Sequence, residues 1–134
     1  MVNMAGEKTN WFLAVDHAGN MTYFMDINWT DGTLKFRQEF ISVPYPDRID
    51  ISDEKIVVLS RVCCDELDVF NKFTIYDLSG NLMHDVSHLP NGEKIQEPVE
   101  IALDPRGNIL LSDDVLGTFV LSGSVVHSHW SQNV

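Results

Sequence analysis

The feature that most constrains the fold is a pair of short apolar runs separated by a tight turn, within residues 99–114. The runs are Glu100–Leu103 and Asn108–Leu111, and the tetrapeptide Asp104–Gly107 (Asp-Pro-Arg-Gly) lies between them. Proline at the second position of a turn presets φ at about −65°, and glycine supplies backbone freedom at the end of the turn. The stretch therefore predicts two adjacent antiparallel strands joined by a hairpin.

The same pattern occurs twice more, nearer the N-terminus, which indicates an internal repeat. In the first copy, the run Phe12–Asp16 is followed by the turn His17–Asn20 and a second run, Met21–Asp26. In the middle copy, Arg48–Asp53 is followed by Lys55–Ser60, with a shorter turn that lacks glycine. Each copy therefore begins with a strand, a turn and a second strand.

The spacing of the copies indicates the size of the repeated unit. Leu13 lies 36 positions before Ile49, and Ile49 lies 52 positions before Ile101. These spacings bracket the period of about 40 to 50 residues of a four-stranded propeller blade. The second halves also match, because Phe73–Met83 and Thr118–Val126 both contain Leu-Ser-Gly between two β-rich runs. We therefore predict an all-β chain, a partial β-propeller of about three four-stranded antiparallel blades, with a two-sheet sandwich as the alternative.

The segment Thr33–Ile41 occupies the corresponding place in the first copy. Leu34 and Phe36 alternate there with Lys35 and Arg37. Alternation with a period of two is typical of a strand with one face in water and the other face buried.

Length and composition fit a single domain of 134 residues, 44% of them hydrophobic. The polar residues 1–10 predict a flexible N-terminal segment, and residues 11–134 predict the propeller segment. The expected blades span about residues 11–46, 47–97 and 98–134.

The sequence favours a cytoplasmic protein. No apolar run approaches the roughly 18 residues that a bilayer crossing needs, and the N-terminus lacks the apolar core of a signal peptide. The only two cysteines, Cys63 and Cys64, are adjacent. Adjacent cysteines rarely bridge each other and do not form a CxxC zinc motif, so a reducing compartment fits best.

The charge balance disfavours nucleic acid as a partner. Nine Lys and Arg against twenty Asp and Glu give a formal net charge of −11. Nucleic-acid binding depends on Lys and Arg side chains that neutralise phosphates. An acidic chain instead favours solubility or a basic protein partner.

The run Pro98–Asp113 resembles an NHL repeat, the blade unit of NHL-type β-propellers. In that family an apolar inner strand ends in Asp, a Pro/Gly turn follows, and the second strand ends near another Asp. The first copy here departs from the pattern by lacking the turn proline, and the middle copy by lacking the turn glycine. The resemblance implies that Leu13–Val15, Ile49–Ile51 and Ile101–Leu103 lead inner strands that line a central axis.

The resemblance also implies a larger ring, commonly of six blades, of which three are half. The chain is then either a fragment of a longer propeller or a homodimer whose two halves close a ring. NHL propellers often lie at the C-terminus of tripartite-motif proteins, where they bind protein or RNA.

Several residues are candidate metal ligands. Oxygen ligands for a hard cation would come from Asp16, Asp104, Asp113 and Asp114, as in some six-bladed hydrolase propellers that hold calcium in their channel. Aspartates at strand ends are also ordinary turn formers that bind nearby backbone amides, and we expect that role and no metal.

A second candidate is the pair His127 and His129, which lie on one face of a strand near Trp130. Such a pair suits a transition metal, but no cysteine lies nearby. We expect an exposed strand face instead. Ser124 and Ser128 lie close to these histidines in the sequence but form no recognisable catalytic motif.

The leading hypothesis is a non-enzymatic protein-interaction module without a cofactor. The predicted binding residues are Arg48, Asp50 and Glu100, beside the inner strands, and Trp29, in a loop. Large aromatic and arginine side chains often anchor interfaces.

Two alternatives remain open. One is a calcium-dependent lactonase- or esterase-like propeller that uses Asp16 and Asp104, and the other is an RNA-binding NHL propeller.

Overall fold

A computed structural model describes residues 11–62, 70–122 and 132–133, and it is all-β. The described part of the chain contains no α-helix. The strands are β1 (Trp11–Asp16), β2 (Met21–Asn28), β3 (Thr33–Ser42), β4 (Pro46–Ile51), β5 (Lys55–Ser60), β6 (Lys72–Asp77), β7 (Leu82–Val86), β8 (Pro98–Leu103), β9 (Ile109–Asp113), β10 (Gly117–Leu121) and β11 (Gln132–Asn133). The predicted all-β class is confirmed.

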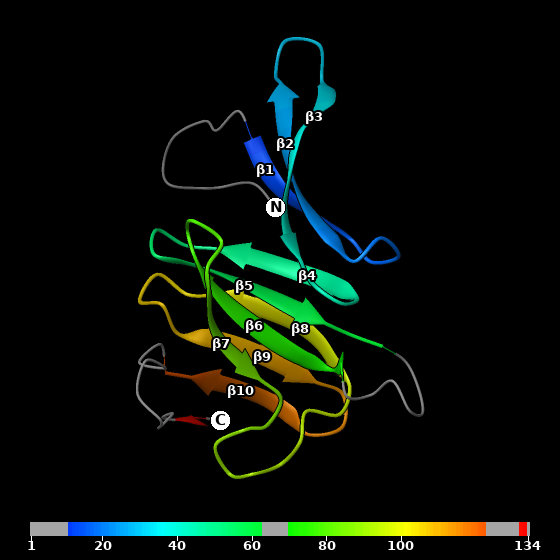
Figure 1. The fold of residues 1–134 in the computed structure, drawn as a ribbon. Helices are drawn as coiled ribbons and strands as arrows, with labels where there is room; N and C mark the ends of the chain where they lie inside the picture. Colours follow the sequence, from blue (N-terminus) through cyan, green and yellow to red (C-terminus); the bar gives the residue numbers. More distant parts are fainter. Residues whose placement is uncertain (1–10, 63–69, 123–131, 134) are drawn as a thin grey trace.

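The strands form three separate antiparallel sheets, each of which follows the chain order (Figure 1). The first sheet has the order β1-β2-β3, the second β4-β5-β6-β7 and the third β11-β10-β9-β8. The expected antiparallel units are therefore present. In the described residues the first sheet has three strands, where four were expected.

The second sheet lies between the first and the third (Figure 1). One of its two central strands, β5, is buried on both faces. Successive side chains of a strand point to opposite faces of the sheet. Val57 and Leu59 accordingly pack in the core against the third sheet, whereas Ile56 and Val58 pack in the core against the first. Burial on both faces explains why β5 is a continuous apolar run rather than an alternating one.

Two hydrophobic cores join the three sheets. The core between the first and second sheets consists of Leu13, Ile41, Val43, Ile56, Val58 and Tyr76. The core between the second and third sheets consists of Val57, Leu59, Phe73, Ile75, Leu89, Ile95, Ile101, Ile109, Leu111, Phe119 and Leu121.

Two hairpins share one turn chemistry, in the segments Asp77–Asn81 and Asp104–Asn108. In both, the Asp carboxylate accepts hydrogen bonds from the amide two residues on and from the backbone and side chain of the Asn four residues on. Gly80 and Gly107 adopt φ values of 90° and 82°, which glycine tolerates without strain. The hairpins predicted from the Asp-Pro-Arg-Gly sequence and from Leu78–Gly80 are confirmed. The second Leu-Ser-Gly turn, Leu121–Gly123, extends outside the described residues.

The expectation of one buried face for β3 is wrong over most of the strand. Residues 33–39 are all exposed, including Leu34 at 60% and Phe36 at 53%. The alternation of apolar and charged side chains is present, but no described part of the chain covers the apolar side.

Several sequence predictions fall outside the described residues. These are the N-terminal segment 1–10, the cysteine pair Cys63–Cys64, and the segment with Ser124, Ser128, His127, His129 and Trp130. The described residues include no helix with the length and hydrophobicity that a membrane crossing requires.

Candidate functional site

Three of the four predicted binding residues lie together where the inner strands meet. The inner strands β1 and β4 adjoin, as do β4 and β8. Arg48 lies on β4 and Glu100 on β8, and the Arg48 Nε atom lies 3.8 Å from Glu100 Oε2. Both side chains are about half exposed, so this ion pair is accessible on the surface.

Asp50, the third residue, is engaged within the fold. Its Oδ2 atom accepts a hydrogen bond of 2.7 Å from the backbone amide of Leu103 in β8, and its Oδ1 atom accepts one of 2.8 Å from the amide of Ile51. The carboxylate therefore joins the inner edges of the second and third sheets. Its position beside the inner strands was predicted, but this joining contact was not.

Trp29 lies apart from these residues. It occupies the turn between β2 and β3, at the end of the hairpin that extends from the first sheet, and it is 54% exposed. The structure thus brings together Arg48, Asp50 and Glu100 and leaves Trp29 elsewhere.

Of the four candidate calcium ligands, Asp104 and Asp113 each accept two or more backbone amide hydrogen bonds, whereas Asp16 accepts one and Asp114 is exposed. Asp113 is 4% exposed, and its two carboxylate oxygens accept four hydrogen bonds from backbone amides, at 2.9–3.1 Å. The Asp16 carboxylate accepts a hydrogen bond of 3.0 Å from the backbone amide of Gly19. The described residues contain no group of three or more His, Cys, Asp or Glu side chains that would hold a metal ion.

The pKa values of the turn aspartates reflect the same hydrogen bonds. Hydrogen bonds from Asn81 hold the pKa of Asp77 below its ordinary value. Burial acts to raise the pKa of Asp104, but hydrogen bonds from Asn108 and from the Arg106 amide outweigh it, so that pKa is also lowered. Both groups are therefore stabilised in the carboxylate form by their own turns.

The outer face of the first sheet is apolar and lacks a covering sheet in the described structure. Because Leu13 and Phe24 point into the core between the first and second sheets, the residues next to them in each strand point to the opposite face. Strand pairing then brings Met25 opposite Phe12 on one side and Phe36 on the other. We define the outer face of the first sheet as Phe12, Ala14, Tyr23, Met25, Ile27, Leu34 and Phe36.

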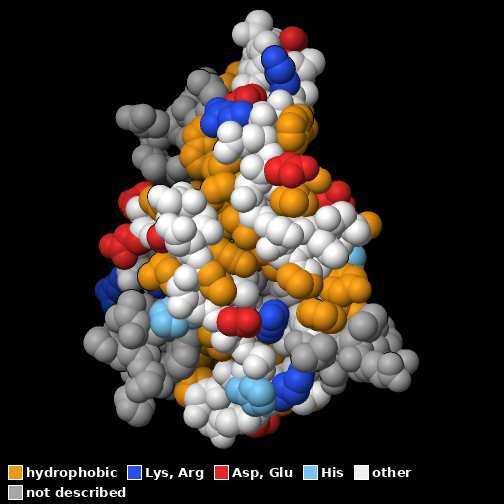
Figure 2. Space-filling model, in the orientation of Figure 1, with side chains coloured by type: hydrophobic (Ala, Val, Ile, Leu, Met, Phe, Trp, Pro, Cys, Tyr) orange, Lys and Arg blue, Asp and Glu red, His pale blue; other side chains and the backbone are white. Residues whose placement is uncertain are grey.

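Aromatic packing and nearby acids mark this outer face. The rings of Tyr23 and Phe36 meet edge to face, with centroids 5.6 Å apart. Burial raises the pKa of Tyr23, and the carboxylates of Asp16 and Glu39 add to the rise. Figure 2 shows hydrophobic side chains at the upper end of the molecule interleaved with basic and acidic ones.

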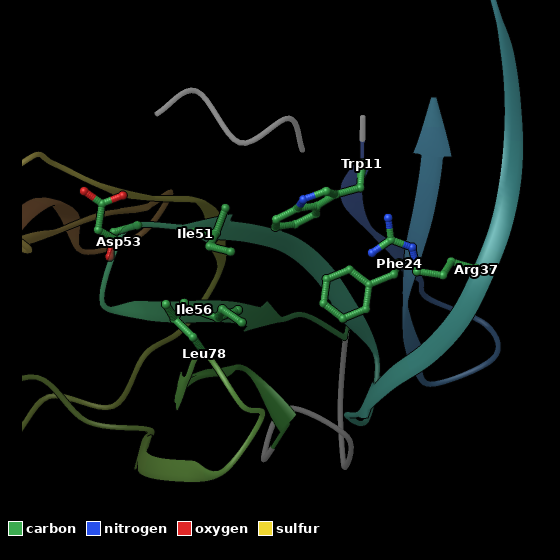
Figure 3. A pocket seen from close by; sticks show the side chains of 8 residues that line it. Trp11, Phe24, Arg37, Ile51, Asp53, Ile56 and Leu78 are labelled. Atoms are coloured by element: carbon green, nitrogen blue, oxygen red, sulfur yellow. The ribbon is translucent and has the colours of Figure 1, made fainter. Parts of the chain in front are cut away.

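A cleft of about 380 Å³ opens between the first and second sheets (Figure 3). Trp11, Phe24 and Arg37 line it from the first sheet. The opposite wall consists of Ile51, Ser52, Asp53, Ile56 and Leu78.

The charged groups of the first-sheet wall are already paired. The Arg37 guanidinium donates to both carboxylate oxygens of Asp26 and lies 5.9 Å from the centroid of the Phe24 ring. The Trp11 and Phe24 rings meet edge to face, at 5.3 Å between centroids. Sequence reasoning missed this cleft, because its two walls come from different sheets and share no motif.

The comparisons with known proteins assign no family. No family model matches the chain, and no curated protein matches it in sequence.

Proposed function

We propose that the protein is a non-enzymatic protein-interaction module built on NHL-like propeller blades, and that two copies associate to close a ring. The observation that carries the proposal is the outer face of the first sheet, which no sheet of the described residues covers. The second sheet, in contrast, has both faces packed against neighbouring sheets. Large exposed apolar patches commonly mark association surfaces.

The order of the sheets supports the propeller arrangement. Three antiparallel meanders follow one another along the chain, and the inner strands β1, β4 and β8 adjoin in that order. Blades of a propeller are four-stranded sheets arranged radially around a central channel. Three such units are half of a six-bladed ring, so each half-ring has two end faces to cover.

A second copy offers a matching end face. In the third sheet, Ile101, Leu111 and Leu121 point into the core, so the alternating side chains Ala102, Leu110 and Val120 point outward. In a two-fold dimer, the outer face of each first sheet would pack on this face of the partner's third sheet. Two equivalent interfaces then cover all four end faces of the dimer, and the assembly is closed.

Solution mass tests the proposal directly. We expect light scattering across a dilution series to give about twice the 15.2 kDa mass of the chain. Phe36→Asp places a charge within the proposed interface, and we expect it to yield a folded monomer because Phe36 is 53% exposed. Leu82→Asp is the matched control, since Leu82 is 60% exposed on β7 of the second sheet.

Two results would overturn the proposal. One is a monomeric wild-type chain at every concentration, and the other is a Phe36→Asp variant that dimerises as the wild type does. Circular dichroism of each variant establishes that the fold is retained.

A further inference from the structure

The cleft between the first and second sheets is a separate surface from the outer face, because it opens on the other side of the first sheet. The hydrophobic core between these two sheets fills most of the space that separates them, but a cleft of about 380 Å³ remains beside Trp11. Binding sites for small ligands commonly have volumes of about 300 to 1,000 Å³. This cleft lies at the small end of that range, so it suits one large side chain with its adjoining backbone.

Each wall of the cleft carries large apolar side chains beside its polar ones. Trp11 and Phe24 present aromatic rings on one side, and Figure 3 shows Ile51, Ile56 and Leu78 facing them from the other. Leu78 lies in the turn between β6 and β7 and is 46% exposed. A large apolar side chain inserted between these walls would remove exposed apolar surface on both.

The charge at the cleft favours a cation. Because Asp26 pairs with Arg37, the one cation lining the cleft in the described structure is already neutralised. Asp53 also lines the cleft, is exposed, and forms no hydrogen bond or ion pair with the other described residues. The net charge of −11 acts in the same direction over longer distances.

We propose that this cleft binds a peptide segment of a partner protein in which a large apolar side chain is flanked by lysine or arginine. The apolar side chain lies between Trp11 and Leu78, and a flanking cation contacts the Asp53 carboxylate. Hydrophobic burial supplies the affinity, and the carboxylate supplies the preference for basic over acidic neighbours.

Capped tripeptides test the proposal on the full chain. Acetyl-Lys-Phe-Lys-amide is titrated against ¹⁵N-labelled protein, and the indole N–H signal of Trp11 is followed by NMR. We expect this signal to shift in a saturable manner. We expect acetyl-Glu-Phe-Glu-amide to bind at least tenfold more weakly.

Variants separate the apolar and the charged contributions. Leu78→Ser, at an exposed turn position, should weaken binding of the basic peptide at least fivefold, whereas the control Leu82→Ser should leave binding unchanged. Asp53→Asn should retain binding but remove most of the preference for the lysine peptide over the glutamate peptide.

Each contrary outcome overturns the inference. An unshifted Trp11 signal excludes the cleft, and equal binding of both peptides excludes the role of Asp53. Nuclear Overhauser contacts between residues 1–10 and the Leu78 methyl groups in the free protein would assign the cleft to the chain itself.

Discussion

Replacing Asp50 by alanine tests how the second and third sheets are joined. The Asp50 carboxylate accepts hydrogen bonds from the backbone amides of Leu103, in the neighbouring sheet, and of Ile51, in its own strand. A hydrogen bond to a charged group contributes about 1.5–3 kcal/mol, and an amide left without a partner is penalised further when water cannot reach it. Because Asp50 is half-buried, we expect Asp50→Ala to lower the free energy of unfolding by about 2–4 kcal/mol.

The neighbouring ion pair provides an internal comparison on the same two strands. Arg48 and Glu100 lie 3.8 Å apart, with side chains 48% and 61% exposed. Exposed pairs of this kind contribute roughly 0–1 kcal/mol, because water and salt screen them. We therefore expect Arg48→Ala and Glu100→Ala each to change the free energy of unfolding by less than about 1 kcal/mol.

Urea unfolding followed by circular dichroism measures both effects, provided that the slope of the free energy of unfolding against urea concentration is the same in all variants. Asp50→Asn keeps one carbonyl oxygen and should lose less stability than Asp50→Ala. The reasoning is refuted if Asp50→Ala has the same free energy of unfolding as the wild type. It is also refuted if Arg48→Ala destabilises the protein more than Asp50→Ala does.

Three further predictions concern the turns. Asp113→Ala leaves four backbone amides without their acceptor and should lower the free energy of unfolding by about 3–5 kcal/mol in the same urea assay, and a loss below about 1 kcal/mol would contradict this. Because the folded-state pKa values of Asp77 and Asp104 lie below the ordinary 3.8, their contribution to stability is present above that pH and is lost as the pH falls below it. Melting temperatures measured from pH 6 to pH 2 should therefore fall less for an Asp77→Asn, Asp104→Asn double variant than for the wild type, and parallel curves would refute the assignment. Gly80→Ala should destabilise by about 1–2 kcal/mol in thermal unfolding, because φ is 90° and the new Cβ would meet the Phe40 ring at 3.3 Å, and an unchanged melting temperature would contradict it.

The sequence predicts the local architecture well because that architecture depends on local chemistry. The Asp-x-x-Gly-Asn turns at Asp77 and Asp104 satisfy their own backbone amides and fix two hairpins without help from distant residues. The period of two along each strand also predicts on which face of the sheet each residue lies. Three antiparallel units could therefore be predicted from sequence alone.

Contacts between sheets could not be predicted in the same way. The bond from Leu103 to Asp50 joins residues 53 positions apart, and the cleft beside Trp11 forms only because two sheets diverge there. Nothing in the sequence of either strand specifies the distance between the sheets. The same limit explains β3, whose alternation correctly predicts a strand but not whether another sheet covers Leu34 and Phe36.

The ring arrangement is tested most directly by contacts between two copies of the chain. A sample mixed from ¹³C-labelled and unlabelled protein, measured with an isotope filter, reports only intermolecular nuclear Overhauser effects. Ring closure predicts contacts between the Leu34 methyl groups of one copy and the Leu110 methyl groups of the other. Contacts between Leu34 of both copies, or no intermolecular contacts at concentrations where the mass is doubled, would contradict it.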